Sequence, residues 1–364
     1  MSAIVEVARS DAPPLLAVEG LVKHYLAPRR WLQKPRPPVR AVDGVSFTLA
    51  RGETLALVGE SGCGKTTTAK SVLRLVEPTS GSVRFEGEEL LTLDAGRMRE
   101  RRRDLQIIFQ DPYASLNPRM TAGEIVGEPL RNFAQADGDA RASAAAPAAL
   151  ANARGRRDRV AWLFEKVGLR AEALDRYPHE FSGGQRQRIG IARALALQPR
   201  LIVCDEPVSA LDVSVQATVL NLLADLRDRL GLAYLFISHD LSVVVHIADR
   251  IAVMYAGMIC EEGPTDAVLA PPYHPYTAAL LSAIPVVDPE SPRPTRIRPR
   301  VQAGSEVPHR GCVFAHRCAH RIEGICDTAP PPVIAASARH RIWCHLPLEE
   351  LQRMPSALLA QLSR

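Results

Sequence analysis

The chain has 364 residues, which is too long for one ordinary domain and enough for about two. Its composition is that of a soluble globular protein, and a net charge of +5 is too small at this length to indicate a nucleic-acid-binding protein. No apolar run approaches the ~18 residues that a membrane span needs, and the N-terminus lacks the apolar core of a signal peptide. We therefore expect a protein that lies in the cytosol or is held by a partner on the cytosolic side of a membrane.

The first third of the chain predicts a series of short strands. We expect residues 1–12 to be disordered, residues 27–39 to form an exposed connection rich in Pro and Arg, and the charged run 97–103 to be the solvated face of a helix. The expected strands, in chain order, cover residues 15–25, 42–49, 54–58, 82–85 and 105–109. In the second of them Val45, Phe47 and Leu49 alternate with polar residues, which predicts a half-buried strand.

A phosphate-binding loop follows the apolar strand 54–58 and opens a helical pattern over residues 66–75. It has the spacing G-x-x-x-x-G-K-[ST], in the strand–turn–helix context that this pattern needs. Its members are Gly59, Glu60, Ser61, Gly62, Cys63, Gly64, Lys65, Thr66 and Thr67. The glycines let backbone N–H groups surround a phosphate at a helix N-terminus. Lys65 would add a point charge to the phosphates, and the Thr66 hydroxyl would ligate Mg²⁺.

The middle of the chain turns helical and then returns to strands. We interpret the Ala-rich residues 134–157 as a poorly specified insertion, helical or mobile, with no chemistry of its own. Ser182 is expected to cap a helix that runs to about Leu197. The other expected elements are helices over 121–130, 159–167 and 213–230, strands over 201–204 and 233–237, and a hairpin over 250–262 that turns at Ala256-Gly257.

Two carboxylates, Asp205 and Glu206, stand at the end of the buried strand 201–204. A strand end is rigid, so both groups would be held in place. Asp205 would hold Mg²⁺ directly or through water, and Glu206 would orient and deprotonate the attacking water in phosphoryl transfer. A surface acidic pair would be the simpler interpretation if no phosphate loop preceded it.

Residues 15–265 resemble the ATP-binding subunit of ABC transporters. Tyr25 matches the aromatic residue that stacks on adenine, the phosphate loop matches Walker A, and Gln110 matches the Q-loop. The signature is matched by Ser182, Gly183, Gly184 and Gln185, with Phe181 where Leu is more usual. Walker B is matched by residues 201–206, the D-loop by residues 209–212 ending in Asp212, and the switch histidine by His239.

The resemblance implies an ATP- and Mg²⁺-dependent ATPase in which Glu206, His239 and Gln110 act in catalysis, while Thr66, Gln110 and Asp205 hold Mg²⁺. It also implies a head-to-tail pair of ATPase subunits, in which the phosphate loop of one meets the signature helix of the other. The implied partners are a second ABC ATPase subunit, two transmembrane permease subunits and, indirectly, an extracytoplasmic solute-binding protein, without nucleic acid. We expect the second ATPase to be a different chain, and an identical one stays open. The implied place is the cytoplasmic face of the inner membrane, as a peripheral subunit.

A finer resemblance points to the oligopeptide/dipeptide importer branch, through residues 42–47, 109–118, 274–277 and the tail from Val307 to Cys344. The insertion after Tyr25 and the cysteine in the phosphate loop resemble the F-type ATPase of that branch. Nickel and glutathione importers share these features, so the cargo stays open. An ABC ATPase for DNA repair or ribosome work is a weaker alternative, because the chain has one module and a short insertion. A regulatory subunit is weaker too, because Glu206 and His239 are both kept.

Four cysteines mark the tail: Cys312, Cys318, Cys326 and Cys344. In a reducing compartment such a group favours a metal site over disulfides. The tail resembles the C-terminal extension of peptide-importer ATPases, which is associated with a [4Fe–4S] cluster. The wide spacing lacks the close pairs usual for zinc. Nearby histidines at 316, 320 and 345 keep Zn²⁺ open as an alternative, and no metal is a third possibility. The tail has few long apolar runs, so we expect the bound metal group to act as a structural staple for it, without a redox role.

The expected fold is α/β: a P-loop NTPase core of the ABC type with a helical subdomain at about residues 112–198, followed by a small Cys-containing extension. The core is expected over residues 13–264 and the extension over residues 265–364.

Overall fold

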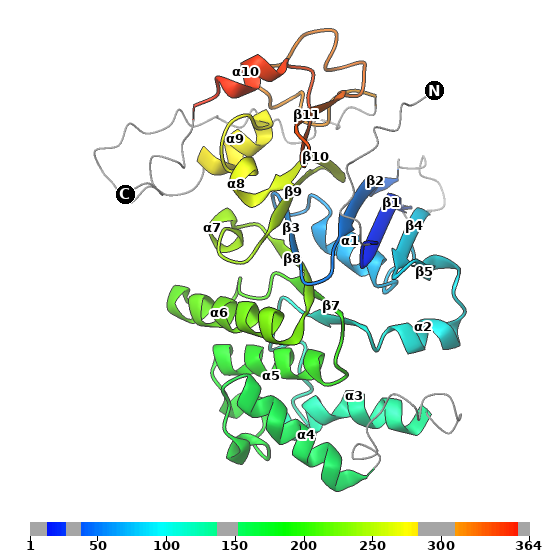
Figure 1. Ribbon diagram of the computed structural model, residues 1–364, viewed down its shortest axis with the longest axis vertical. Coiled ribbons are helices and arrows are strands. Elements are labelled where there is room, and N and C mark those ends of the chain that lie inside the picture. The colour runs from blue at the N-terminus through cyan, green and yellow to red at the C-terminus, as the bar shows by residue number, and fades with distance from the viewer. Residues whose placement is uncertain (1–12, 27–37, 137–151, 283–309, 356–364) are drawn as a thin grey trace, which may run out of the picture. The chain divides into compact units, whose positions relative to one another are not determined.

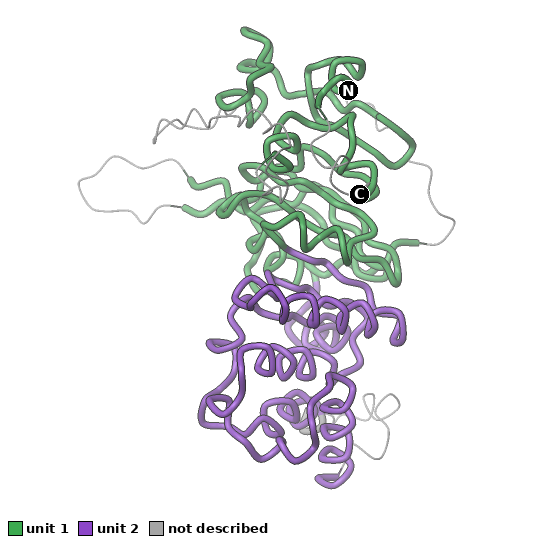
Figure 2. Tube along the Cα trace, turned by 90° about the vertical axis from the view of Figure 1, so that its left-hand side faces the viewer, with its two compact units in different colours: residues 1–92, 238–364 green, residues 93–237 purple. Residues whose placement is uncertain are grey.

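The computed structural model describes residues 13–26, 38–136, 152–282 and 310–355. The expectations for residues 1–12, for most of 27–39 and for the centre of the 134–157 insertion lie outside the described residues. The chain forms two compact units, coloured separately in Figure 2. Unit 1 comprises residues 1–92 and 238–364, and unit 2 comprises residues 93–237.

Unit 1 contains an antiparallel sheet in the order β2-β1-β4-β5. Its strands are β1 (Leu16–Tyr25), β2 (Val39–Leu49), β4 (Ser80–Phe85) and β5 (Glu88–Glu89). The predicted alternation in β2 is confirmed, because Val45, Phe47 and Leu49 are all buried and the residues between them are exposed. One face of this sheet therefore contributes to the core of unit 1.

The second set of strands in unit 1 joins the phosphate-loop strand to the tail (Figure 1). The strands are β3 (Thr54–Val58), β9 (Arg250–Tyr255), β10 (Met258–Pro264), β12 (His340–Trp343) and β11 (Val333–Ser337), each paired with the next. Within this set, β3 and β9 pair in parallel, and the other pairs are antiparallel. All five side chains of β3 are buried, as expected for a strand covered on both faces. The predicted hairpin over 250–262 is confirmed as β9 and β10.

Short helices complete unit 1: α1 (Lys65–Val72), α7 (Leu241–Val244), α8 (Thr265–Val268), α9 (Pro275–Ser282) and α10 (Leu348–Gln352), with a 3₁₀ turn at Leu90–Thr92. The helix α1 ends earlier than the predicted residue 75. Its C-cap is Leu73, and Arg74 has φ +49°, a left-handed conformation that does not continue a helix.

Unit 2 has parallel strands in the order β8-β7-β6 and a group of helices. The strands are β6 (Leu105–Ile108), β7 (Leu201–Asp205) and β8 (Ala233–Ser238). The helices are α2 (Ala95–Arg101), α3 (Ala122–Ala136), α4 (Ala153–Lys166), α5 (Gly183–Leu195) and α6 (Val213–Leu230), with 3₁₀ turns at Ala171–Ala173 and Pro178–Glu180. Helix α5 packs against α3, α4 and α6 (Figure 1). The helix predicted from residue 159 begins at Ala153, because the Asn152 side chain caps it by accepting from the Gly155 N–H at 2.7 Å.

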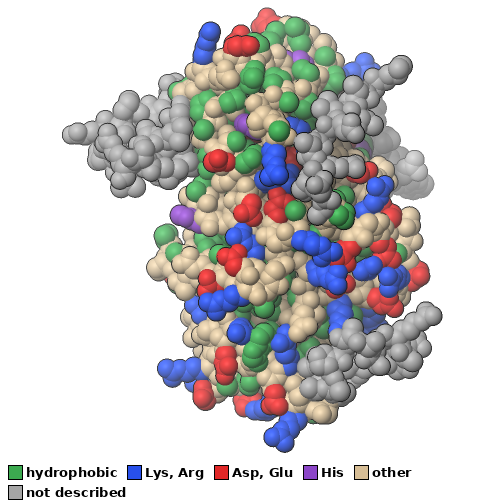
Figure 3. Space-filling view, in the orientation of Figure 1, with side chains coloured by type: hydrophobic (Ala, Val, Ile, Leu, Met, Phe, Trp, Pro, Cys, Tyr) green, Lys and Arg blue, Asp and Glu red, His purple; other side chains and the backbone are tan. Residues whose placement is uncertain are grey.

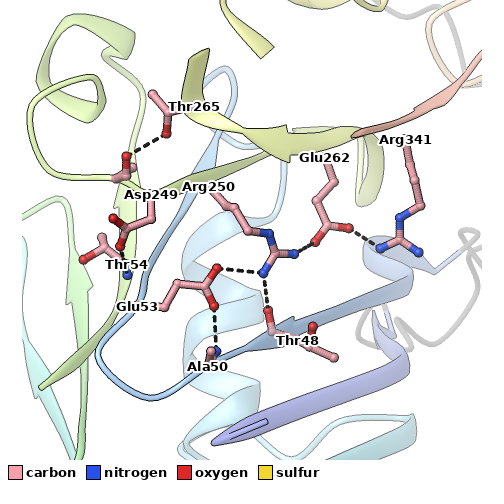
Figure 4. A network of polar contacts seen from close by, with 10 residues as sticks. Thr48, Ala50, Glu53, Thr54, Asp249, Arg250, Glu262, Thr265 and Arg341 are labelled. Atoms are coloured by element: carbon pink, nitrogen blue, oxygen red, sulfur yellow. Dashed lines mark hydrogen bonds and ion pairs between the residues drawn. The ribbon is translucent and has the colours of Figure 1, made fainter. Parts of the chain in front are cut away.

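The expected boundary at residue 264 stays a prediction, but tail and core residues share contacts inside unit 1. Figure 4 shows Arg250 of β9 paired with Glu53 at 2.9 Å and with Glu262 of β10. Glu262 also accepts from Arg341 of β12 at 2.5 Å, and its side chain is 1% exposed. Tail residues therefore supply a partner for a carboxylate buried in the core.

The surface of unit 2 in Figure 3 carries interspersed acidic and basic side chains. Among the described residues, no helix is long and apolar enough to cross a membrane.

Candidate functional site

The phosphate loop is shaped by close backbone approaches that only glycine allows. A Cβ on Gly59 would lie 2.1 Å from the Met254 carbonyl oxygen, because β9 runs directly beside β3. A Cβ on Gly64 would lie 2.1 Å from the carbonyl oxygen of Ala41, and Gly64 has φ +111°. Gly64 is also the N-cap of α1, so the loop delivers the chain to a helix N-terminus. This is the backbone geometry expected for binding a phosphate chain.

Lys65 lies inside this loop and is 4% exposed. Its Nζ donates to the carbonyl oxygens of Gly59 at 2.7 Å and Glu60 at 3.0 Å. The ammonium group is thus held at the loop by backbone oxygens and not by a carboxylate. The neighbouring Cys63 is buried, and burial raises the pKa of its thiol, so its thiol stays protonated at neutral pH.

Glu60 is fixed at both its backbone and its side chain by residues beyond position 264, which the sequence did not predict. Its N–H donates to the hydroxyl of Tyr276 at 2.8 Å. Its carboxylate forms a two-bond pair with the guanidinium of Arg317, at 2.7 and 2.8 Å. In the sequence, residues 274–277 indicate only the resemblance to peptide-importer ATPases. No sequence pattern indicates a role for Arg317, which lies between Cys312 and Cys318.

Tyr25 ends β1 with a ring that is 41% exposed. The ammonium of Lys23 lies 5.0 Å from the ring centroid. The ring has a free surface on which a base could stack, and its adenine role stays a prediction.

In unit 2 the structure brings two of the predicted catalytic residues together. The Gln110 side-chain N–H donates to the Glu206 carboxylate at 2.9 Å. Glu206 follows the buried Asp205 at the end of β7 and has φ +48°, which is uncommon for a residue with a side chain. Its N–H donates to the Ile237 carbonyl oxygen of the adjacent strand at 3.1 Å, which holds this strained position. The carboxylate is therefore oriented by the strand ends and by Gln110.

The signature residues open helix α5 as predicted. The Ser182 hydroxyl accepts from the Gln185 N–H at 3.4 Å, and the Gln185 side chain accepts from the Ser182 N–H at 3.0 Å. Ser182 and Gly183 are exposed, while Phe181 beside them is buried. A Cβ on Gly184 would lie 2.4 Å from a methyl of Val215, so glycine there allows α5 to pack close to α6.

The remaining predicted residues stand at element ends. Asp212 is the exposed N-cap of α6. His239 follows β8 and is exposed, and beside it the Asp240 N–H donates to the Ser238 hydroxyl at 3.0 Å. Thr66 lies in the first turn of α1. Their roles toward nucleotide and Mg²⁺ stay predictions.

The four tail cysteines are free thiols. Burial, with a smaller effect of the neighbouring cysteines, raises the pKa of Cys318 to about 11 and that of Cys344 to about 12. The Cys312 N–H donates to the Cys326 carbonyl oxygen at 2.7 Å, and the Ile322 N–H donates to the Cys326 sulfur at 3.4 Å.

The donor chemistry of the tail fits a thiolate-bound group, but the described geometry does not yet form a site. Both ring nitrogens of His345 are buried without a hydrogen-bond partner, as is Nδ1 of His316. Yet nowhere in the described ranges are three or more His, Cys, Asp or Glu side chains grouped so that they could hold a metal ion. The described residues therefore show no formed site for either a [4Fe–4S] cluster or a zinc ion.

Comparison with known proteins decides the family. The ABC transporter family model matches residues 42–209, and the model of the oligopeptide/dipeptide transporter C-terminal region matches residues 260–326. A probable peptide ABC transporter ATP-binding protein of Sinorhizobium fredii is 48% identical over 356 residues, covering 96% of this chain and 94% of that protein. The chain belongs to the ATP-binding subunits of ABC transporters. The oligopeptide transport ATP-binding protein OppF of Salmonella typhimurium is 47% identical, covering 94% of this chain and 98% of that protein.

Two further proteins, one solved structure and one relative, are similar to large parts of the chain. The dimeric, ADP- and phosphate-bound ATP-binding cassette MJ0796 superposes with a TM-score of 0.57 at 27% identity, covering 69% of this chain and 98% of that one. The glutathione import ATP-binding protein GsiA of Salmonella typhimurium is 51% identical over 83% of this chain, but the chain spans only 46% of that protein. The ABC ATPase fold and its ATP-hydrolysing activity, both expected from the sequence, are thereby confirmed.

Proposed function

We propose that this chain is the ATP-hydrolysing subunit of a membrane importer for di- or oligopeptides. The observation that carries the proposal is the tail. The oligopeptide/dipeptide transporter region matches over residues 260–326, and relatives named for peptide or oligopeptide transport match nearly the whole chain. In the proposed assembly the chain pairs with a second, non-identical ATPase subunit and two permease subunits at the cytoplasmic face of the cell membrane. An extracytoplasmic binding protein delivers the peptide.

The geometry of the site supports a separate role for each residue in ATP binding or hydrolysis. The phosphate-loop amides and Lys65 bind the β- and γ-phosphates, and the exposed Tyr25 ring stacks on adenine. Glu206 accepts the proton of the attacking water, and Gln110 orients that carboxylate through their 2.9 Å bond. Thr66, Asp205 and Gln110 would hold Mg²⁺, which supplies charge neutralisation of the phosphates when bound. His239 would contact the γ-phosphate.

The geometry of the signature segment, residues 182–185, supports an ATPase that works as a pair of subunits. Ser182 and Gly183 are exposed at the N-terminus of α5, a helix of 13 residues, and helix N-termini favour anions. We propose that these residues, with Gly184, Gln185 and Asp212, face the ATP bound on the partner's phosphate loop. ATP then joins the two subunits, and hydrolysis releases them.

Glutathione import is the second candidate, because a glutathione import protein is 51% identical over 83% of this chain. The chain spans about half of that relative, so the match assigns no cargo by itself. Nickel, which the sequence resemblance leaves open, is a third candidate.

Uptake by the assembled transporter separates the cargos. The chain is expressed with its permease and binding protein in cells that lack their own peptide importers, and uptake of labelled tri- and tetrapeptides, glutathione and Ni²⁺ is measured. We expect peptide uptake that excess unlabelled peptide suppresses and that is lost with Glu206→Gln. Uptake of glutathione or Ni²⁺ without peptide uptake would contradict the peptide assignment.

We propose further that the four tail cysteines hold a [4Fe–4S] cluster, with Zn²⁺ as the alternative. Support comes from the four tail cysteines, which are all free thiols and so can supply the four thiolate ligands that such a cluster takes. Anaerobically purified protein should be brown with equal iron and sulfide, and Cys326→Ser should bleach it while Cys260→Ser does not. Zinc without iron would contradict the cluster.

A further inference from the structure

An ion pair between Arg317 and Glu60 joins the tail to the phosphate loop. Arg317 and Glu60 are 257 positions apart, and Nη1 and Nη2 of the arginine each bond one oxygen of the glutamate, at 2.7 and 2.8 Å. This parallel arrangement is the strongest geometry available to an arginine–carboxylate pair. The Arg317 side chain is 18% exposed and that of Glu60 is 44% exposed, so the pair lies at the edge of the loop and is partly screened by water.

A platform of aromatic rings holds the guanidinium in place. The Arg317 guanidinium carbon lies 5.8 Å from the ring centroid of Tyr255 and 5.9 Å from that of Phe314. The Tyr255 ring meets the rings of Tyr276 and Phe314 edge-on, at centroid distances of 4.7 and 5.2 Å. Tyr276 and Phe314 are at most 2% exposed. The arginine therefore has few rotamers to lose when it pairs with Glu60.

Tyr276 fixes the same loop residue at its backbone. Its hydroxyl accepts the Glu60 N–H at 2.8 Å. The Glu60 carbonyl oxygen in turn accepts from the Lys65 ammonium at 3.0 Å. A shift of Glu60 would consequently move an oxygen that orients the phosphate-binding lysine.

We propose that Arg317 is a positioning residue for nucleotide binding: together with Tyr276 it holds Glu60, so that the phosphate loop and Lys65 are preorganised for the triphosphate. Preorganisation lowers the entropy cost of binding, so its loss weakens affinity more than it slows the bound complex. This inference rests on nucleotide binding by the phosphate loop and does not depend on the cargo. It also gives the tail a part in ATP binding, which the sequence did not predict.

The test compares variants of the full-length chain. Arg317→Met removes the ion pair. Arg317→Lys keeps the positive charge but cannot form the two parallel bonds of a guanidinium. Tyr276→Phe removes only the hydroxyl. Arg321→Met is the matched control, because Arg321 pairs with Asp327 within the same tail at 2.7 Å. Affinity is measured with a fluorescent ATP analogue, kcat and KM by steady-state ATPase in the assembled transporter, and folding by the melting temperature.

We expect Arg317→Met to raise both the Kd of the analogue and the KM for ATP about 5- to 10-fold, and Tyr276→Phe about 3-fold, with kcat at saturating ATP within about twofold. Arg317→Lys should recover part of the affinity, and Arg321→Met should change nothing. Unchanged affinity in both Arg317→Met and Tyr276→Phe, with only a lower melting temperature, would overturn the proposal.

A double variant separates positioning from the direct attraction of Arg317 for phosphate. If Arg317 acts through Glu60, adding Arg317→Met to Glu60→Gln should cause little further loss. An equal loss in both backgrounds would overturn the proposal, since the charge would then act on the phosphates directly. Absence of nucleotide binding by the unaltered chain would overturn both this inference and the function on which it rests, whereas equal affinities of the unaltered chain and the variants overturn this inference alone.

Discussion

Glu261 offers a sharp test of how the tail is joined to the core. It lies in β10 with no exposed surface. Its carboxylate accepts from Nε2 of His340 at 2.8 Å, from the His274 N–H at 2.8 Å and from the Thr277 hydroxyl. Two of these donors follow β10 closely in the chain, and His340 comes from the tail strand β12.

The change Glu261→Ala removes the acceptor and leaves three buried donors without a partner. An unsatisfied buried polar group costs about 1–3 kcal/mol, and three such donors are left here. Since the site can relax, we expect a loss of about 3–5 kcal/mol in the free energy of unfolding. Glu261→Gln keeps one acceptor oxygen, so its loss should be smaller.

Urea unfolding and thermal melting of the full chain measure the effect. A loss of this size should lower the melting temperature by on the order of 10 °C. Glu323→Ala changes an exposed tail carboxylate and should stay within about 0.5 kcal/mol of the unaltered chain. Equal stability of Glu261→Ala and the unaltered chain would refute the reasoning that this carboxylate joins tail and core.

Two other predictions concern binding surfaces. Tyr25→Ala should weaken ATP affinity about 5- to 150-fold and Tyr25→Phe only mildly, because base stacking on an aromatic ring contributes about 1–3 kcal/mol; unchanged affinity with a lower melting temperature would favour a structural role. Cysteines introduced along 112–130, the segment after Gln110, should cross-link to the permease, because Gln110 contacts the catalytic carboxylate and would pass its movement to this segment; capture only through residues 213–230 would place the docking face elsewhere.

The strands and loops of the nucleotide-binding core could be predicted because their signals are local. The run 54–58 is apolar throughout and leads into a glycine loop, and the structure buries every one of its side chains. Ser182 precedes its helix at capping distance from Gln185, and both bonds of that cap are present. Each of these features depends on residues within a few positions of one another, so a local sequence pattern is enough to predict it.

The contacts of the tail could not be predicted because they join residues far apart in the chain. Glu261 and Glu262 end the predicted hairpin, and both are at most 1% exposed, which no local pattern indicates for two adjacent acidic residues. They are buried because β12 supplies His340 and Arg341 as partners. Likewise, no local pattern relates Arg317 to Glu60. Charge complementarity of this kind becomes visible only once the tail strands have paired with β10.

ATP turnover by the assembled transporter tests the central claim most directly. Glu206→Gln preserves shape and the contact with Gln110 but removes the proton acceptor. It should keep ATP binding and lower kcat by a factor of about 10² or more, with peptide uptake lost in parallel. Lys65→Ala should weaken ATP binding as well. Near-normal ATP turnover in Glu206→Gln would contradict the account of this chain as an ABC ATPase whose chemistry is carried by Glu206.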